Sequence, residues 1–81
     1  MDQGQILKEV NDIFKDVLDE DGISLTRETV ADDVEDWDSL THINIVVAIE
    51  KHFNIKFTSL EIQNFKDVGA MCDRISEKLS R

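Results

Sequence analysis

A serine hydroxyl lies in the most informative segment of the chain, Glu35-Asp36-Trp37-Asp38-Ser39-Leu40. Asp38 is a natural N-cap for a helix that begins at Ser39, because its carboxylate can accept hydrogen bonds from the free backbone N–H groups of the first turn. A group joined to Ser39 through a phosphate would lie where free N–H groups and the positive end of the helix dipole favour negative charge. Ser39 is therefore a candidate attachment residue, although a serine at the start of a helix is more often only part of the cap.

Catalysis by Ser39 itself has little support in the sequence. The nearest imidazole, His42, follows three residues later, but no carboxylate is placed to orient it and no oxyanion site is evident. We therefore expect His42 to be a solvated residue on the helix surface. Asp38 is expected to act as a cap and recognition residue rather than as a base. The sequence predicts no catalytic residue.

Cysteine and histidine usage predicts no metal site. Cys72 is the single cysteine, and His42 and His52 stand ten residues apart. One cysteine cannot form an internal disulfide, which fits a reducing compartment, and we expect Cys72 to be a small core residue. The first residues, Met1-Asp2-Gln3-Gly4, lack the basic and apolar regions of a signal peptide. We therefore expect a cytoplasmic protein.

Length and charge narrow the classes of function. The 81 residues include nine Lys+Arg and eighteen Asp+Glu, for a net charge of −9. This length predicts one domain, residues 1–81, with a thin core and little room for a large enzyme pocket. The acidity argues against nucleic-acid binding, and no apolar stretch approaches the roughly 18 residues of a membrane span. Residues 1–38 hold thirteen acids and three basic residues, which indicates either a basic partner or a solubilising surface.

Hydrophobic periodicity predicts an all-α fold. The first helix carries an apolar stripe of Ile6, Leu7, Val10, Ile13, Phe14, Val17 and Leu18. We expect Gly22 to supply the left-handed backbone that ends this helix. Residues 23–37 lack a period and predict a long loop held to the core by Ile23, Leu25, Val30 and Val34; loops of this length are often functional. A second helix is predicted over 39–53, with Leu40, Ile43, Val46, Val47, Ile49 and Phe53 at helical spacing and Ile45 and Ala48 widening the stripe.

Capping signals predict two further helices. Thr58-Ser59-Leu60-Glu61 matches a capping box, with Phe57 and Ile62 placed for a hydrophobic staple, so a short third helix should end near Asn64. Asp67 is expected to cap a fourth helix that carries Val68, Met71, Cys72, Ile75 and Leu79. The predicted architecture is a small bundle of three main helices and one short helix, with a long loop between the first and second helices.

The motif Asp38-Ser39-Leu40 and its surroundings resemble the acyl carrier proteins. The succession of helices and the segment 48–57, Ala-Ile-Glu-Lys-His-Phe-Asn-Ile-Lys-Phe, extend the resemblance over nearly the whole chain. The resemblance implies a 4'-phosphopantetheine arm on Ser39, transferred from coenzyme A by a separate phosphopantetheinyl transferase, with Asp38 and Leu40 as flanking recognition residues. The arm would carry acyl groups as thioesters for fatty-acid, polyketide or related biosynthesis. The implied partners are this transferase and the enzymes that load, elongate or transfer acyl groups, and we expect the carrier to be a monomer.

Two departures from the best-known fatty-acid carriers indicate a specialised carrier. Small residues typically precede the motif in those carriers, whereas Asp36 and Trp37 precede it here, and the second helix keeps few acids besides Glu50. The expected partner-binding residues are Leu40, Val47, Glu50 and Asp36. The helical interior could shelter an acyl chain against Val46, Ile49, Phe65 and Met71, unless these four are ordinary core residues.

Two alternatives remain open at the level of sequence. A peptidyl or D-alanyl carrier would keep the same arm and change the cargo. An unmodified acidic helical module would use its loop and an exposed Val47 to bind another protein. A phosphopantetheine-sized mass increment that is lost in Ser39→Ala would separate the carriers from the module.

Overall fold

The computed structural model describes residues 2–80, and over this range the chain forms four α-helices and one short 3-10 helix. The α-helices are α1 (Gln3–Leu18), α2 (Ser39–Phe53), α3 (Ser59–Gln63) and α4 (Val68–Leu79). The 3-10 helix, η1 (Ala31–Asp33), interrupts the long loop between α1 and α2. The all-α architecture predicted from the sequence is confirmed, and η1 is an addition to it.

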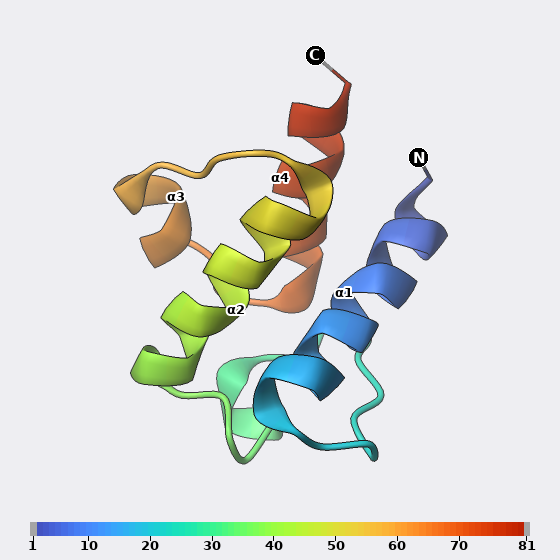
Figure 1. Ribbon diagram of the computed structural model, residues 1–81, viewed down its shortest axis with the longest axis vertical. Helices are drawn as coiled ribbons and strands as arrows, with labels where there is room; N and C mark the ends of the chain where they lie inside the picture. Colours follow the sequence, from blue (N-terminus) through green and yellow to red (C-terminus); the bar gives the residue numbers. More distant parts are fainter. Residues whose placement is uncertain (1, 81) are drawn as a thin grey trace.

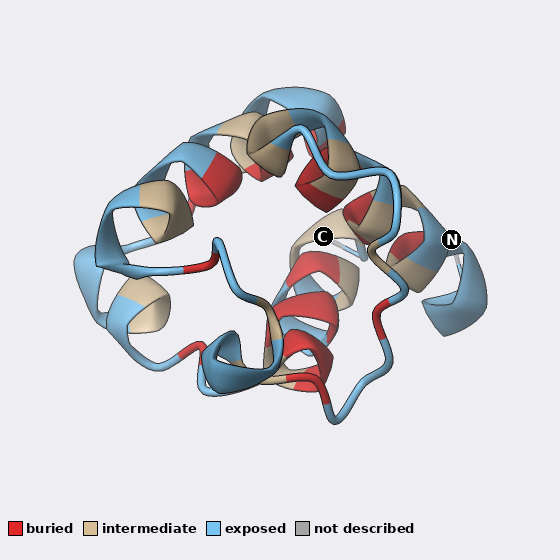
Figure 2. Ribbon diagram, turned by 90° about the horizontal axis from the view of Figure 1, so that it is seen from below, coloured by how far each residue is buried: buried red, intermediate tan, exposed pale blue. Residues whose placement is uncertain are grey.

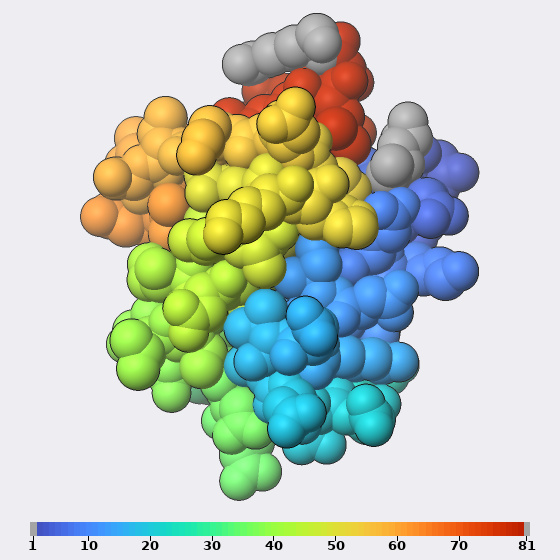
Figure 3. Space-filling model, viewed as in Figure 1, coloured from blue at the N-terminus to red at the C-terminus, as the bar shows by residue number. Residues whose placement is uncertain are grey.

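The three long helices form the body of the bundle. α1 packs against both α2 and α4, and α3 lies to one side of them (Figure 1). The buried positions of the helices face inward, and their outer surfaces are mostly exposed (Figure 2). On the face shown in Figure 3, side chains of α2 lie at the surface between α3 and α1. One side of α2 is therefore open to solvent.

The buried faces follow the predicted stripes for α1 and only partly for α2. In α1, Ile6, Val10, Ile13 and Phe14 are buried, and in α2 the buried residues are Ile45, Val46, Ile49 and Phe53. Three apolar residues of this stripe, Leu40, Ile43 and Val47, are 74%, 50% and 42% exposed. Exposure is expected for Leu40 and Val47 as partner-binding residues, whereas that of Ile43 is not predicted from the sequence. Apolar spacing around α2 is too broad to mark a single face, so the positions of α1 and α4 decide which side is buried.

Local capping defines the helix ends, with one correction. Asp2, Asp38, Thr58 and Asp67 each accept a hydrogen bond from a backbone N–H of the helix that follows, as N-caps do. The prediction that Gly22 ends the first helix is wrong, because Asp19 adopts the left-handed conformation, with φ of 52°, directly after Leu18. Aspartate tolerates this conformation better than most residues.

The long loop is held to the bundle by buried side chains and by hydrogen bonds. Leu25 and Trp37 are buried, and Ile23 and Val34 pack against the same core. The side-chain amide of Asn11 in α1 receives a 2.7 Å hydrogen bond from the N–H of Leu25. These contacts fix the loop before it reaches α2.

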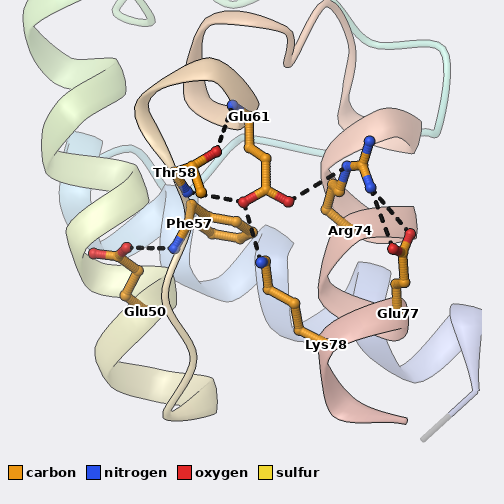
Figure 4. A network of polar contacts seen from close by, with 7 residues as sticks. All are labelled: Glu50, Phe57, Thr58, Glu61, Arg74, Glu77 and Lys78. Atoms are coloured by element: carbon orange, nitrogen blue, oxygen red, sulfur yellow. Dashed lines mark hydrogen bonds and ion pairs between the residues drawn. The ribbon is translucent and has the colours of Figure 1, made fainter. Parts of the chain in front are cut away.

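A network of ion pairs attaches α3 to α4 (Figure 4). Glu61 and Thr58 form the predicted capping box, with Thr58 N–H donating to Glu61 Oε1 over 2.8 Å. The Glu61 carboxylate also lies 3.1 Å from Lys78 Nζ and 3.7 Å from Arg74 Nε. The Thr58 N–H and the Lys78 ammonium hold the pKa of Glu61 below its usual range. One carboxylate therefore caps α3 and holds it against α4.

Candidate functional site

Ser39 is the first residue of α2 and is exposed. The turn that carries it is fixed by its neighbours. Asp38 Oδ1 accepts hydrogen bonds of 2.9 Å from the N–H groups of Leu40 and Thr41. Thr41 Oγ1 in turn accepts from Asp38 N–H over 2.8 Å and donates to the carbonyl of Asp36 over 2.7 Å. A rigid cap therefore presents the Ser39 hydroxyl to solvent.

The electrostatics of this helix start differ from the expectation that its N–H groups are free. The N–H groups of Leu40 and Thr41 are occupied by Asp38 Oδ1, and that of His42 donates to the Asp38 carbonyl. Hydrogen bonds from the backbone of Thr41 and Leu40 lower the pKa of Asp38. The Asp38 carboxylate is therefore ionised at neutral pH. Its negative charge lies at the start of α2, where it offsets the positive end of the helix dipole.

Ser39 opens onto a cleft of about 400 Å³ between α2 and α3. The lining is mostly apolar and includes Trp37, Ser39, His42, Ile43, Ile62 and Phe65. A second hollow, of about 420 Å³, lies between the end of α1 and the acidic loop, and Asp36 lines it. Because Ser39 lines only the first of these two hollows, the first is the one that adjoins the candidate attachment residue.

Trp37 and His42 pack together in the wall of the cleft. Trp37 is buried, and its ring stacks on that of His42 with centroids 6.0 Å apart. The expectation that His42 is a solvated surface residue is wrong: it is half-buried, and both of its ring nitrogens have hydrogen-bond partners. Sequence reasoning missed this pair. The spacing of the two residues could have revealed this contact. Trp37 directly precedes the cap and His42 is the fourth helical residue, and these are the two positions that pack together in a hydrophobic staple.

The residues predicted to bind partners divide into two groups. Leu40 and Val47 are exposed on α2, and Asp36 is exposed in the loop before it. Glu50 is half-buried, and its carboxylate accepts a 2.8 Å hydrogen bond from the N–H of Phe57 (Figure 4). Glu50 therefore positions the segment between α2 and α3.

Ile43 and Leu60 were not predicted as surface residues but are 50% and 68% exposed. Ile43 follows Leu40 by three residues on α2 and also lines the cleft. Exposed aliphatic residues at this spacing lie on one side of a helix. Leu40, Ile43 and Val47 therefore form an apolar strip on the outer side of α2.

The four residues predicted to line an acyl pocket are all buried. Phe65 lines the cleft beside Ser39. Val46, Ile49 and Met71 belong to the core cluster and are not among the residues that line this cleft. The structure therefore brings one of the four to the candidate attachment residue.

Cys72 is fully buried, and burial raises the pKa of its thiol to about 11. It is thus a core residue, as predicted, and remains protonated at neutral pH. In the described part of the chain, no group of three or more His, Cys, Asp or Glu side chains is arranged to hold a metal ion. Between residues 2 and 80, no helix combines the length and apolar character needed to cross a membrane.

Comparisons with known proteins define the class to which this fold and site belong. Residues 8–75 match the protein family described as "Phosphopantetheine attachment site". The fold is similar to the solution structure of a holo acyl carrier protein from Geobacter metallireducens, with a TM-score of 0.88 and 46% sequence identity over 94% of this chain and 87% of that one. A comparison with curated proteins found no match. The chain belongs to the acyl carrier protein family, whose members have a phosphopantetheine attachment site.

Proposed function

We propose that Ser39 is the attachment residue for 4'-phosphopantetheine and that the protein is a specialised carrier of acyl groups. The observation that carries this proposal is the exposed hydroxyl of Ser39, which lies at the start of α2 in the motif Asp38-Ser39-Leu40 and opens onto an apolar cleft. Ser24 and Ser59 are also exposed but lack this setting. When attached, the arm supplies a terminal thiol that holds an acyl group as a thioester.

The residues around Ser39 fit such an arm. The cap holds the serine on a rigid turn, and the adjoining cleft offers apolar contact close to the attachment point. Both nitrogens of His42 are engaged by Trp37 and Ile62, so this imidazole is not free to act as a base for Ser39. The attachment chemistry is therefore assigned to a separate phosphopantetheinyl transferase.

Partner enzymes are proposed to dock on the outer side of α2. Leu40, Ile43 and Val47 supply the apolar contact, and Asp36 in the preceding loop supplies negative charge. An apolar centre with a charged rim is typical of transient protein interfaces. The partners would be enzymes that load, elongate or transfer acyl groups in fatty-acid, polyketide or related biosynthesis, and the carrier would act as a cytoplasmic monomer.

Modification in vitro tests the proposal directly. The unmodified protein is incubated with coenzyme A, Mg²⁺ and a broad-specificity phosphopantetheinyl transferase, and its intact mass is then measured. We expect a single phosphopantetheine increment in the wild type and none in Ser39→Ala. An increment that persists in Ser39→Ala would place the arm on another residue. No increment in either protein would favour the unmodified interaction module.

A further inference from the structure

The hydrogen bonds of His42 fix the position of its proton. Trp37 Nε1 lies 3.0 Å from His42 Nδ1, and His42 Nε2 lies 3.2 Å from the carbonyl oxygen of Ile62. An indole nitrogen can only donate and a carbonyl oxygen can only accept. His42 is therefore neutral in this arrangement, with its proton on Nε2. Trp37 donates to the ring, and the ring donates to Ile62.

These two hydrogen bonds form the Trp37–His42–Ile62 bridge, which joins the end of the long loop to α2 and α2 to α3. Trp37 is only 5% exposed, and its ring meets Phe14 of α1 edge-on with centroids 4.9 Å apart. Phe65 meets the His42 ring edge-on at 6.2 Å. The bridge is thus anchored in the core at Trp37 and holds α3 in place at Ile62.

The bridge stands between Ser39 and the interior of the bundle. Its three residues line the cleft together with Ser39. Val46 and Ile49 follow His42 by about one and two turns along α2 and are fully buried. An alkyl chain that entered from Ser39 and passed between α2 and α3 would separate His42 from Ile62 or from Trp37. Such a separation leaves polar groups in a partly buried site without partners, which is unfavourable.

We propose that the Trp37–His42–Ile62 bridge keeps the gap between α2 and α3 closed, so that this carrier is suited to short acyl groups that remain outside the core. The proposal rests on attachment of the arm to Ser39. A long alkyl chain gains free energy for each methylene that it buries, but here it must first open a hydrogen-bonded contact. A short acyl group has too few methylenes to drive that opening. Trp37 and His42 are thus specificity-determining residues of the carrier.

The experiment compares two cargoes on the wild type and on bridge variants. Butyryl- and tetradecanoyl-phosphopantetheine are attached from the corresponding coenzyme A thioesters, and intact mass confirms each loading. NMR then follows the indole N–H of Trp37, the ring nitrogens of His42 and the methyl groups of Val46, Ile49 and Met71. In the wild type we expect the Nε2–H form of His42, an unchanged indole resonance and unchanged core methyl resonances with both cargoes.

The variants Trp37→Phe and His42→Phe remove the bridge while keeping an aromatic ring, and His52→Ala, the other histidine of α2, is the matched control. With tetradecanoyl cargo, the bridge variants should show shifted core methyl resonances and a raised melting temperature, and His52→Ala should show neither. Contacts between a tetradecanoyl chain and Ile49 or Met71 in the wild type would overturn the proposal and support the acyl pocket expected from the sequence. The proposal would also be overturned if the core methyl resonances and the melting temperature of the bridge variants were the same with butyryl and with tetradecanoyl cargo. Failure of attachment to Ser39 is recognised separately, because the mass increment would then be missing.

Discussion

The backbone N–H of Gly69 donates a 2.8 Å hydrogen bond to the carbonyl oxygen of Arg27, which brings the long loop onto the first turn of α4. The neighbouring N–H of Val68 donates to the carbonyl of Thr29 over 2.9 Å. Two N–H groups at the start of α4, which its own turns cannot satisfy, are therefore satisfied by the loop. The close approach is possible because residue 69 has no side chain.

We expect Gly69→Ala to destabilise the protein by about 1–3 kcal/mol, the usual cost of overpacking a buried site. A Cβ at this position would lie 2.9 Å from the Arg27 carbonyl oxygen, closer than such atoms normally approach. Gly4→Ala is the matched control, because its Cβ would meet only the flexible Asp2 side chain at 3.4 Å. Urea unfolding followed by circular dichroism measures both. If Gly69→Ala were as stable as the control, the loop would be free to move away from α4.

Acid should weaken the attachment of α3 to α4. Glu61 has a pKa below its ordinary value of 4.5 in the folded protein, so the folded state binds fewer protons there than the unfolded state. Its contribution to stability is therefore complete above pH 4.5 and decreases as the pH falls through the lowered pKa.

Glu61→Gln tests this contribution, because glutamine can still accept the Thr58 N–H but cannot pair with Lys78 or Arg74. We expect a loss of up to about 1 kcal/mol at neutral pH and a smaller difference from the wild type near pH 3. Glu77→Gln, which alters a half-exposed ion pair with Arg74 on the same helix, serves as a control and should change little. A pH-independent difference between Glu61→Gln and the wild type would show that the charge of Glu61 is not the cause.

Docking of partner enzymes should depend more on Val47 than on Glu50. Val47 is exposed in the apolar strip of α2, whereas the Glu50 carboxylate is engaged by the Phe57 N–H. We expect Val47→Glu to lower the catalytic efficiency of acyl transfer by its native enzymes about tenfold, as loss of a moderate interface contact would. Glu50→Gln, which keeps an oxygen acceptor for Phe57, should have a smaller effect. Ser24→Glu adds the same charge in the long loop and controls for charge alone. A larger loss of catalytic efficiency in Glu50→Gln than in Val47→Glu would favour docking through an acidic helix surface.

Added salt should raise the melting temperature. Thirteen acids and three basic residues lie in residues 1–38, and exposed like charges repel less once salt shortens the screening length to about 10 Å or below. Asp32→Asn with Asp36→Asn should reproduce part of the gain, on the order of 1 kcal/mol or roughly 4–8 °C. Asp33 is left unchanged, because its carboxylate accepts a hydrogen bond from Val30 N–H. Calorimetry in low and high salt measures the effect, and a melting temperature indifferent to salt would mean that the repulsion is already balanced in the fold.

The sequence alone determined the features of this protein that depend on neighbouring residues. The start of α2 at Ser39, the capping box of Thr58 and Glu61 and the cap at Asp67 were all predicted and are confirmed. Each depends on hydrogen bonds between groups three residues apart or closer, so the local sequence contains both partners. The buried face of α1 could also be predicted from the sequence, because the apolar residues of this helix lie on one side only.

Only the tertiary structure decided the features that join distant segments. His42 is half-buried because Trp37 packs on it and because the carbonyl oxygen of Ile62, twenty residues away, accepts a hydrogen bond from its ring. α2 is apolar on more than one side, so which of its residues are exposed, Ile43 among them, depends on where α1 and α4 lie. Caps are fixed by chain connectivity over a few bonds, whereas burial and long-range hydrogen bonds depend on how whole helices pack. For that reason the capped helix start that carries the candidate attachment serine could be predicted from the sequence, and the bridge beside it could not.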